Sequence, residues 1–218
     1  MLCTFYIWQI DGGFRAVVDA SLADAVIKRL RMYVLRAKVV VAERAEPLYF
    51  HPSSQAALSH DGAQYAVLAG YALSETMSVL GALSDWTLAH IQAGVAWISA
   101  TSSEQFVPQA TNYELVGGVN FQKGCYPGQE VVARSQYLGK LKRRAAIGIM
   151  ASTGAESVPV MADIDAAGEP QPVGSVILAQ GNWLLFECPQ GRLGDRLSCL
   201  GRAISVQPLP YEIVDITA

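Results

Sequence analysis

The last third of the chain consists of short β-rich runs separated by Gly, Pro and Asp turns, and this pattern constrains the fold most strongly. After Gly139 the runs cover residues 144–150, 158–162, 173–179, 183–187 and 202–207. Short strands at such regular spacing are typical of a small antiparallel barrel or sandwich. We therefore expect a C-terminal β-barrel domain over residues 140–218, with a boundary near residue 139.

The first 139 residues predict an α+β domain. Two β-rich stretches, 4–10 and 15–19, flank D-G-G, which is a strong hairpin turn signal. Apolar residues at helical spacing predict an amphipathic helix over 22–35, and a β-branched run predicts a strand over 37–43. This β-β-α-β order is that of half of a ferredoxin-like unit. The remaining expected elements are strands at 48–50, 63–69 and 119–121 and helices at 74–83 and 86–94.

Positive charge is concentrated in one segment. Residues 45–122 contain no Lys or Arg, whereas residues 123–144 carry six basic side chains against the single acid Glu130, a local charge of +5 in a chain of net charge −3. Such a segment suggests an anionic partner. A solvated strand with charges on its exposed face is the alternative. The six basic residues are Lys123, Arg134, Lys140, Lys142, Arg143 and Arg144.

Cysteine and histidine usage indicates neither a disulfide framework nor a metal site. The chain has four cysteines and three histidines, with no C-x-x-C and no H-E-x-x-H pattern. We therefore expect a reduced, cytoplasmic compartment and no bound metal. Residues 62–83 are apolar, but polar side chains interrupt them, so we expect no membrane partner.

Residues 123–134, K-G-C-Y-P-G-Q-E-V-V-A-R, place the single thiol of Cys125 between two glycines. Pro127 suits the first turn of a helix, and Q-E-V-V-A-R-S-Q predicts a short helix after it. A helix N-terminus with Lys123 and Arg134 nearby would stabilise a thiolate, which predicts an exposed, reactive sulfur. The alternative is a buried structural cysteine. A cysteine-protease interpretation is disfavoured, because the nearest histidine, His90, has no recognisable orienting partner.

The stretch K-G-C-Y-P-G-Q-E resembles the signature of the YgfZ family, folate-binding relatives of the glycine-cleavage T-protein (aminomethyltransferase). Collinear flanking segments extend the resemblance over roughly residues 85–218. They are Q-A-G at 92–94, E-Q-F-V-P-Q-A-T-N at 104–112, G-G-V-N-F at 117–121, G-K-L-K-R-R-A at 139–145 and Q-P-L-P-Y at 207–211.

The resemblance implies T-protein-like α+β layers around a channel that binds tetrahydrofolate. It also implies a role in the synthesis or repair of iron–sulfur proteins and in the tRNA modification linked to them. Its partners would be folate, iron–sulfur proteins or their assembly factors, and tRNA. Relatives carry a further segment before the strand at 4–10, so the domain over 1–139 is expected to be N-terminally incomplete.

The resemblance assigns roles to individual residues. Cys125, with Lys123 beside it, would carry the thiol chemistry, including a transient iron–sulfur contact. Gln92 stands where T-protein-like members often carry a glutamate near the pterin. The remaining signature positions are Gly124, Tyr126, Gly128, Gln129, Glu130 and Arg134, and the expected folate contacts are Gln92, Arg143 and Arg144.

Two other functions remain open. One is a true folate-dependent aminomethyltransferase or methyltransferase, although the T-protein uses no such cysteine. The other is an RNA- or protein-binding module without catalysis, because a +5 segment fits RNA phosphates as well as a folate polyglutamate tail. Aromatic residues for base stacking are sparse in that segment, with Tyr126 and Tyr137 alone, and DNA is not an expected partner.

Overall fold

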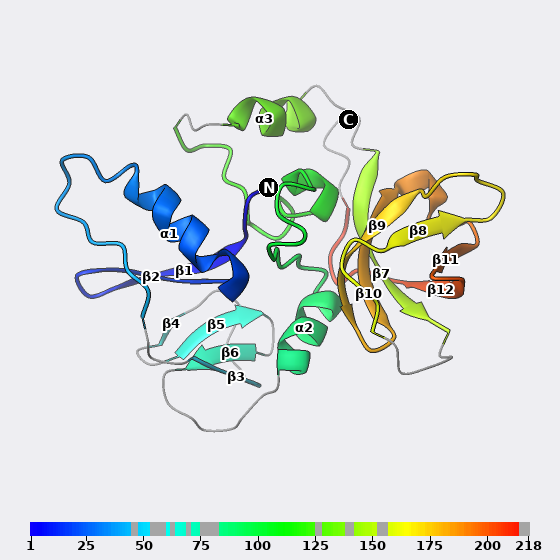
Figure 1. The fold of residues 1–218 in the computed structure, drawn as a ribbon, viewed down its shortest axis with the longest axis horizontal. Helices are drawn as coiled ribbons and strands as arrows, with labels where there is room; N and C mark the ends of the chain where they lie inside the picture. Colours follow the sequence, from blue (N-terminus) through cyan, green and yellow to red (C-terminus); the bar gives the residue numbers. More distant parts are fainter. Residues whose placement is uncertain are drawn as a thin grey trace. The chain divides into compact units, whose positions relative to one another are not determined.

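The computed structural model describes residues 1–44, 48–52, 60–61, 64–68, 71–74, 83–124, 128–137, 142–151 and 157–213. The chain divides into two compact units (Figure 1). One unit comprises residues 2–89 and 97–103, and the other comprises residue 1, residues 90–96 and residues 104–218. The boundary expected near residue 139 falls in 138–141, outside the described residues.

The first unit begins with the hairpin that the D-G-G signal predicts. Strands β1 (Phe5–Ile10) and β2 (Gly13–Val18) pair antiparallel, with Ile10 opposite Gly13. Asp11 and Gly12 therefore form a two-residue turn, and Gly12 adopts φ +74°, a left-handed conformation that favours glycine. The predicted hairpin is confirmed.

The helix after the hairpin is shorter than predicted. A 3₁₀ turn, η1 (Ala20–Leu22), leads into α1 (Ala23–Arg31), and Asp19 Oδ1 caps the turn by accepting a hydrogen bond from Ser21 N at 3.0 Å. No α1 side chain is fully buried, and Leu30 is 50% exposed. The amphipathic pattern is thus correct, but its apolar stripe is only partly covered.

The strand predicted over 37–43 does not form, so the expected β-β-α-β order is wrong at its last strand. Residues 38–44 have no regular secondary structure, and Arg31 donates two hydrogen bonds, of 3.0 and 2.8 Å, to Val41 O. Val40 is 90% exposed. A β-branched run gains from a strand only where a neighbouring strand and a half-buried face receive it, and no strand of the described residues pairs with this run.

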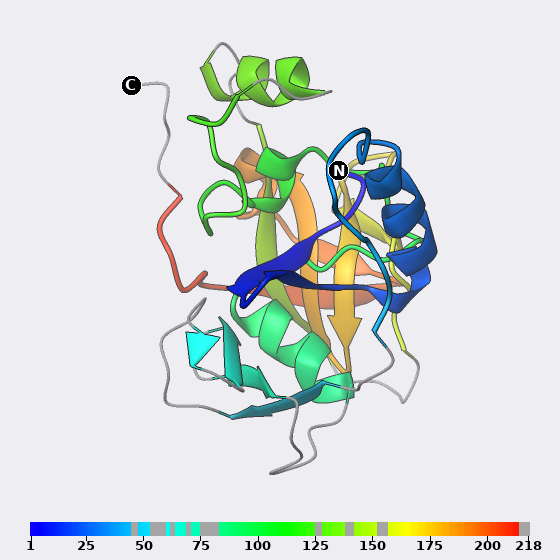
Figure 2. The ribbon, with the colours of Figure 1, turned by 90° about the vertical axis from the view of Figure 1, so that its left-hand side faces the viewer.

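The described part of the first unit also contains a four-stranded antiparallel sheet. The strand order is β3-β6-β5-β4, and the first turns of α2 lie beside the sheet (Figures 1 and 2). The strands expected at 48–50 and 63–69 form, as does the helix expected at 86–94, whereas the helix expected at 74–83 falls mostly in 75–82, outside the described residues. The elements are β3 (Tyr49–Pro52), β4 (His60–Asp61), β5 (Gln64–Leu68), β6 (Tyr71–Ser74) and α2 (Leu83–Gln92).

Aromatic side chains form the centre of this unit. Tyr6 of β1 stacks on Trp97 with ring centroids 5.7 Å apart and meets the edge of Trp86 at 6.0 Å. Phe50 of β3 meets the edge of Trp86 at 5.1 Å. These arrangements are the offset and edge-to-face geometries that aromatic pairs prefer. The cluster joins the hairpin, the four-stranded sheet and α2.

The second unit contains a closed antiparallel barrel of six strands, in the order β10-β7-β12-β11-β8-β9 (Figure 1). This confirms the small antiparallel barrel that the turn spacing predicts. The strand expected at 158–162 is displaced to β8, where Asp163 and Asp165 are exposed and Ile164 and Ala166 are buried. The strands are β7 (Arg143–Met150), β8 (Asp163–Ala166), β9 (Gly174–Gln180), β10 (Trp183–Pro189), β11 (Leu197–Cys199) and β12 (Arg202–Gln207).

Outside the barrel, the described residues of this unit form three short helical elements besides the end of α2. They are η2 (Pro108–Thr111), α3 (Gln129–Tyr137) and η3 (Gln190–Arg192). The strand expected over 119–121 is wrong, because these residues lie in a coil before α3. Among the described residues, no helix has the length and apolar character needed to cross a membrane.

Candidate functional site

The signature segment leads into α3. Lys123 and Gly124 are exposed, Gly128 adopts φ +85°, and α3 begins at Gln129, which confirms the predicted short helix. Cys125 and Tyr126 lie outside the described residues, as does Pro127. The position of Cys125 before the helix therefore follows from the sequence, and its reactivity stays a prediction.

Two contacts connect α3 to residues that precede it in the chain. Phe121, which comes before Cys125, and Tyr137, at the end of α3, meet edge to face, with ring centroids 6.1 Å apart. Within α3, Val132 is buried, and its carbonyl accepts a hydrogen bond of 2.7 Å from Gln109 Nε2. These contacts connect α3 to residues 109 and 121 of the same unit.

The charged residues of α3 pair with each other. Arg134 Nη2 lies 2.8 Å from Glu130 Oε1, and the two side chains are 71% and 73% exposed. Such exposed (i, i+4) pairs contribute little to stability. The expected position of Arg134 near the thiol stays a prediction, and the structure gives Arg134 a carboxylate partner on its own helix.

Two arginines at the start of β7 have unequal environments. Arg143 is 46% exposed and binds Glu187 through two hydrogen bonds, Nε to Oε2 at 2.5 Å and Nη2 to Oε1 at 2.6 Å. The hydrogen bond to Glu187 raises the pKa of Arg143. Arg144 is fully buried, forms an ion pair with Glu114 and donates from Nη1 to Gln109 O at 3.0 Å. The structure thus gives Arg144 an internal partner.

Three of the six cations in the basic segment are therefore neutralised by carboxylates, at Glu130, Glu187 and Glu114. Lys142 is exposed, and Lys140 lies outside the described residues. The +5 charge of the segment overstates the positive charge that it presents to a partner.

Asn112 is the centre of a buried hydrogen-bond network. Its Nδ2 donates to Ala145 O at 2.9 Å and to Tyr211 Oη at 3.2 Å, and Tyr211 Oη donates to Gly94 O at 2.7 Å. Burial raises the pKa of the Tyr211 phenol, which keeps that donor protonated. Asn112 itself has φ +58°, a conformation that Asn tolerates better than most residues.

The residues of this network lie in the segments that flank the signature. Gly94 belongs to Q-A-G, Asn112 to the segment 104–112, Ala145 to the basic strand and Tyr211 to Q-P-L-P-Y. Four segments that are scattered over more than half of the chain are thus joined by hydrogen bonds through Asn112 and Tyr211. Gln109, from the same segment as Asn112, continues the connection to α3.

Close packing joins the first and last of these segments. A Cβ atom at Gly94 would lie 2.8 Å from Leu209 Cδ2 and 2.9 Å from Tyr211 Oη, and φ is +66° there. Only glycine fits such a position without a shift of its neighbours. Gln92, the last residue of α2, is exposed two residues before it.

Several buried atoms of this network have no hydrogen-bond partner among the described residues. Polar atoms buried in this way normally bind ordered water. The sequence did not single out Gln109, Asn112, Glu114 or Tyr211, because burial of a polar side chain leaves no local pattern. The unpartnered atoms are Gln109 Oε1, Asn112 Oδ1, Glu114 Oε2, Arg144 Nε and Arg144 Nη2.

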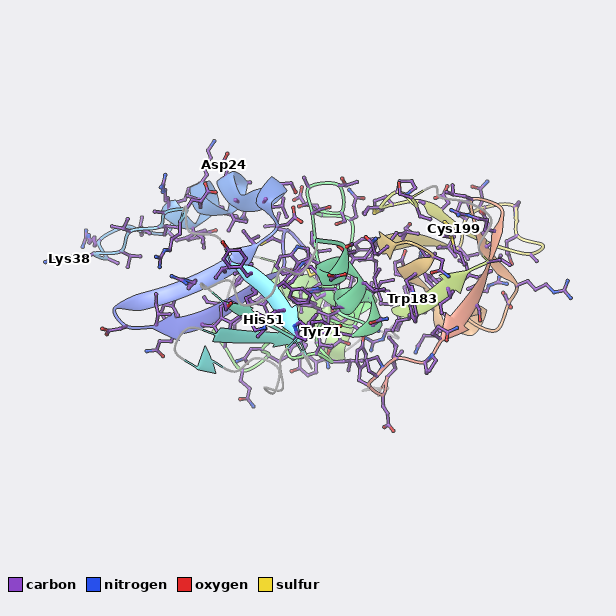
Figure 3. The ribbon with its side chains drawn as sticks, turned by 90° about the horizontal axis from the view of Figure 1, so that it is seen from below. Asp24, Lys38, His51, Tyr71, Trp183 and Cys199 are labelled. Atoms are coloured by element: carbon purple, nitrogen blue, oxygen red, sulfur yellow. The ribbon has the colours of Figure 1, made fainter. Side chains whose placement is uncertain are left out.

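The thiols other than Cys125 have raised pKa values, which lowers their fraction of thiolate. Burial raises the pKa of Cys188 to about 11, and burial also raises the pKa of Cys3 and of Cys199. Cys188 and Cys199, the latter labelled in Figure 3, belong to the barrel core. Among the described residues, no group of three or more His, Cys, Asp or Glu side chains is arranged to hold a metal ion.

No family model matches the chain.

Proposed function

We propose that the chain is a folate-binding accessory protein of iron–sulfur protein synthesis or repair, similar to the YgfZ family, and that the Cys125 thiol is its reactive group. The observation that carries this proposal is that four of the five segments flanking the signature are joined by hydrogen bonds through Asn112 and Tyr211, and that Gln109 connects them to α3. Segments that resemble one family in the same order are expected to form one structural unit if the resemblance reflects a shared fold.

The arrangement suits a protein that presents a thiol on an exposed loop. Functional loops work best when a rigid scaffold positions them. Here the scaffold is the buried network, and Gln109 fastens α3 to it through Val132 O. A thiol four residues before α3 would be held at the surface, where a persulfide, a cluster or a one-carbon unit could reach it.

The proposal of folate binding includes the T-protein-like layering. Its proposed folate contacts are Gln92 and Arg143. Both side chains have exposed surface from which a ligand could be contacted. We leave Arg144 out, because its charge is already paired with Glu114 in the interior. The linked effect on tRNA modification would follow from iron–sulfur enzymes and needs no contact with tRNA.

The thiol proposal is tested by replacing Cys125 in cells that lack the endogenous protein. Cys125→Ala should lower the activity of an iron–sulfur-dependent enzyme and leave the thermal midpoint of the purified protein unchanged. Cys3→Ala is the matched control, because Cys3 is a half-buried thiol with a raised pKa and should retain full activity. Full activity of Cys125→Ala would favour a binding module without catalysis.

A titration tests the folate part separately. Tetrahydrofolate should give a saturable heat signal with the wild-type chain, and Gln92→Ala and Arg143→Ala should weaken it. Absence of saturable binding up to millimolar ligand would contradict folate binding and leave the thiol proposal standing. Folate-dependent aminomethyl transfer that persists in Cys125→Ala would instead support the transferase alternative.

A further inference from the structure

Positive charge also gathers outside the segment 123–144, in a stretch of the first unit that we call the arm (residues 28–40). The arm reads K-R-L-R-M-Y-V-L-R-A-K-V-V, so every residue in it is basic, apolar or aromatic. It holds five basic residues and no acid, a local charge of +5 in a chain of net charge −3. All five cations are exposed, and they are Lys28, Arg29, Arg31, Arg36 and Lys38.

Unlike the segment 123–144, the arm keeps its charge free of carboxylates. In 123–144, three cations bind carboxylates. In the part of the chain that the structure describes, no carboxylate forms an ion pair with any cation of the arm. Figure 3 shows Lys38 at the outer end of the arm, well away from Asp24 in the first turn of α1. The arm therefore presents its positive charge to solvent.

The apolar side chains of the arm are exposed as well. Leu35 is 85% exposed and Val40 is 90% exposed. Large apolar side chains normally lie in the interior, and a cluster of them on the surface marks a site of interaction with a protein or a membrane. Six such side chains of the arm are at least half exposed: Leu30, Met32, Tyr33, Leu35, Val39 and Val40.

The outer part of the arm is a loop with a fixed base. Directly after α1, Val34 N donates to Arg31 O at 3.2 Å. The Arg31 side chain then closes the base of the loop, because its Nε and Nη2 donate to Val41 O at 3.0 and 2.8 Å. A surface loop whose two ends meet in this way is compact. The closed base confines the exposed side chains of residues 32–40 to one small region of the surface.

The combination of cations and exposed apolar groups restricts the partner. A nucleic acid would bind the cations but leave the aliphatic side chains in water, and Tyr33 is the only ring of the arm that could stack on a base. A second copy would cover the apolar groups, but an isologous contact through the arm would bring two +5 segments together. An anionic lipid surface accommodates both, since its phosphates bind Lys and Arg while apolar side chains enter the acyl boundary.

We propose that the arm docks the protein on an anionic lipid surface, with Leu35 and Val40 in the boundary between headgroups and acyl chains and the five cations against lipid phosphates. The expectation of no membrane partner concerned residues 62–83, which would have to span the bilayer, whereas the arm would lie on its surface. The proposal goes beyond the proposed function and depends neither on Cys125 nor on folate.

The test uses the full chain and vesicles of two compositions, and binding is measured by co-sedimentation. Vesicles of equal parts phosphatidylglycerol and phosphatidylcholine should bind the chain saturably. Vesicles of phosphatidylcholine alone should bind it at least about tenfold more weakly, because each Lys or Arg near an anionic surface strengthens binding by about fivefold. Added salt should weaken binding to the anionic vesicles, since it screens these charges.

Two variants with matched controls locate the contact. Leu35→Asn should weaken binding to anionic vesicles by about tenfold, and Leu200→Asn, at a side chain that is 55% exposed in the other unit, should not. Arg36→Gln should weaken binding by about fivefold, and Arg196→Gln, at an exposed cation of the other unit, should not. The positions in the arm are exposed, so the thermal midpoint should stay unchanged and a loss of binding would not reflect unfolding.

The outcomes separate this inference from its alternatives and from the proposed function. Equal binding to both vesicle compositions, or no binding to anionic vesicles at low salt, overturns it. Binding of polyuridylate without binding of vesicles would assign the arm to RNA, and a dimer that Leu35→Asn dissociates would assign it to a second copy; either result without vesicle binding also overturns the inference. Cys125→Ala should bind anionic vesicles like the wild type, so a failure of the thiol proposal would leave this result unchanged.

Discussion

Substitution of Glu114 by Gln removes the charge that balances Arg144 and keeps nearly the same shape. The two side chains are 2% and 0% exposed, so water cannot replace the lost carboxylate. The guanidinium keeps its hydrogen bond to Gln109 O, but it becomes a buried cation without a counter-charge. Breaking a buried pair in this way costs about 3–5 kcal/mol of folding free energy.

The exposed ion pair of α3 provides the control for this substitution. Glu130→Gln removes the partner of Arg134, in a pair whose side chains are 71% and 73% exposed. Exposed (i, i+4) pairs contribute about 0.3–0.5 kcal/mol. In a chain of this size, each kcal/mol corresponds to about 2–4 °C in the unfolding midpoint. We therefore expect a loss of about 6–20 °C for Glu114→Gln and less than about 2 °C for Glu130→Gln.

Urea unfolding followed by circular dichroism gives the free energies, and calorimetry gives the midpoints. A loss of unfolding free energy below about 1 kcal/mol for Glu114→Gln would refute the reasoning, because a buried arginine that has lost its counter-charge should cost more than this. Glu114→Leu combined with Arg144→Met should be less destabilising than Glu114→Gln alone, since an apolar pair leaves no unpaired charge. That comparison separates charge from packing.

Two further predictions concern packing and pH. Gly94→Ala should lower the free energy of unfolding in urea by about 2–4 kcal/mol, because the new Cβ meets Tyr211 at 2.9 Å and φ is +66°. Gly117→Ala is the control, since φ is +76° there and nothing lies within 4 Å of the new Cβ. It should cost only the conformational strain of about 1–2 kcal/mol. Equal losses would show that contact with Tyr211 is irrelevant. The pKa of Cys188 is raised to about 11 in the folded protein, so the unfolded chain loses its thiol proton first as pH rises. The contribution of Cys188 to the free energy of unfolding is therefore intact below about pH 9 and falls by about 2–3 kcal/mol towards pH 11. Cys188→Ala should flatten that part of the stability profile, and an unchanged slope would contradict the assignment.

Local patterns predicted the elements whose conformation is set by nearby residues, even where the strands of the barrel pair with distant ones, as β7 does with β10 and β12. The D-G-G hairpin formed because Gly12 supplies the left-handed turn conformation and the strands that pair are its immediate neighbours. The barrel followed from turn spacing, although one strand was displaced because the Asp163–Ala166 alternation, rather than the run before it, matches a half-buried strand. The helix 129–137 was correct for the same local reason.

The predictions that were wrong or incomplete concern residues whose structure depends on distant partners. The β-branched run at 37–43 has strand propensity, but it pairs with no strand in the part of the chain that the structure describes, and Val40 is 90% exposed. The apolar stripe of α1 predicted a helix and could not specify what covers it. In the candidate site, the bond between Tyr211 and Gly94 spans 117 positions, and no local pattern encodes such a contact. Only the resemblance placed these segments together, and it did so without naming Asn112.

Stability and chemistry can be separated in this molecule because different residues carry them. The buried Arg144–Glu114 pair and Asn112 hold the scaffold, and the thiol of the proposed reaction belongs to Cys125. If the scaffold acts only by positioning α3, Glu114→Gln should raise hydrogen exchange in residues 129–137 and lower cellular activity together. Cys125→Ala should lower activity with exchange unchanged. Once the thiol is gone, adding Glu114→Gln should then reduce activity no further, because a positioning residue has nothing left to position. An additional loss in the double variant would mean that the network contributes to function by a route that does not pass through the thiol.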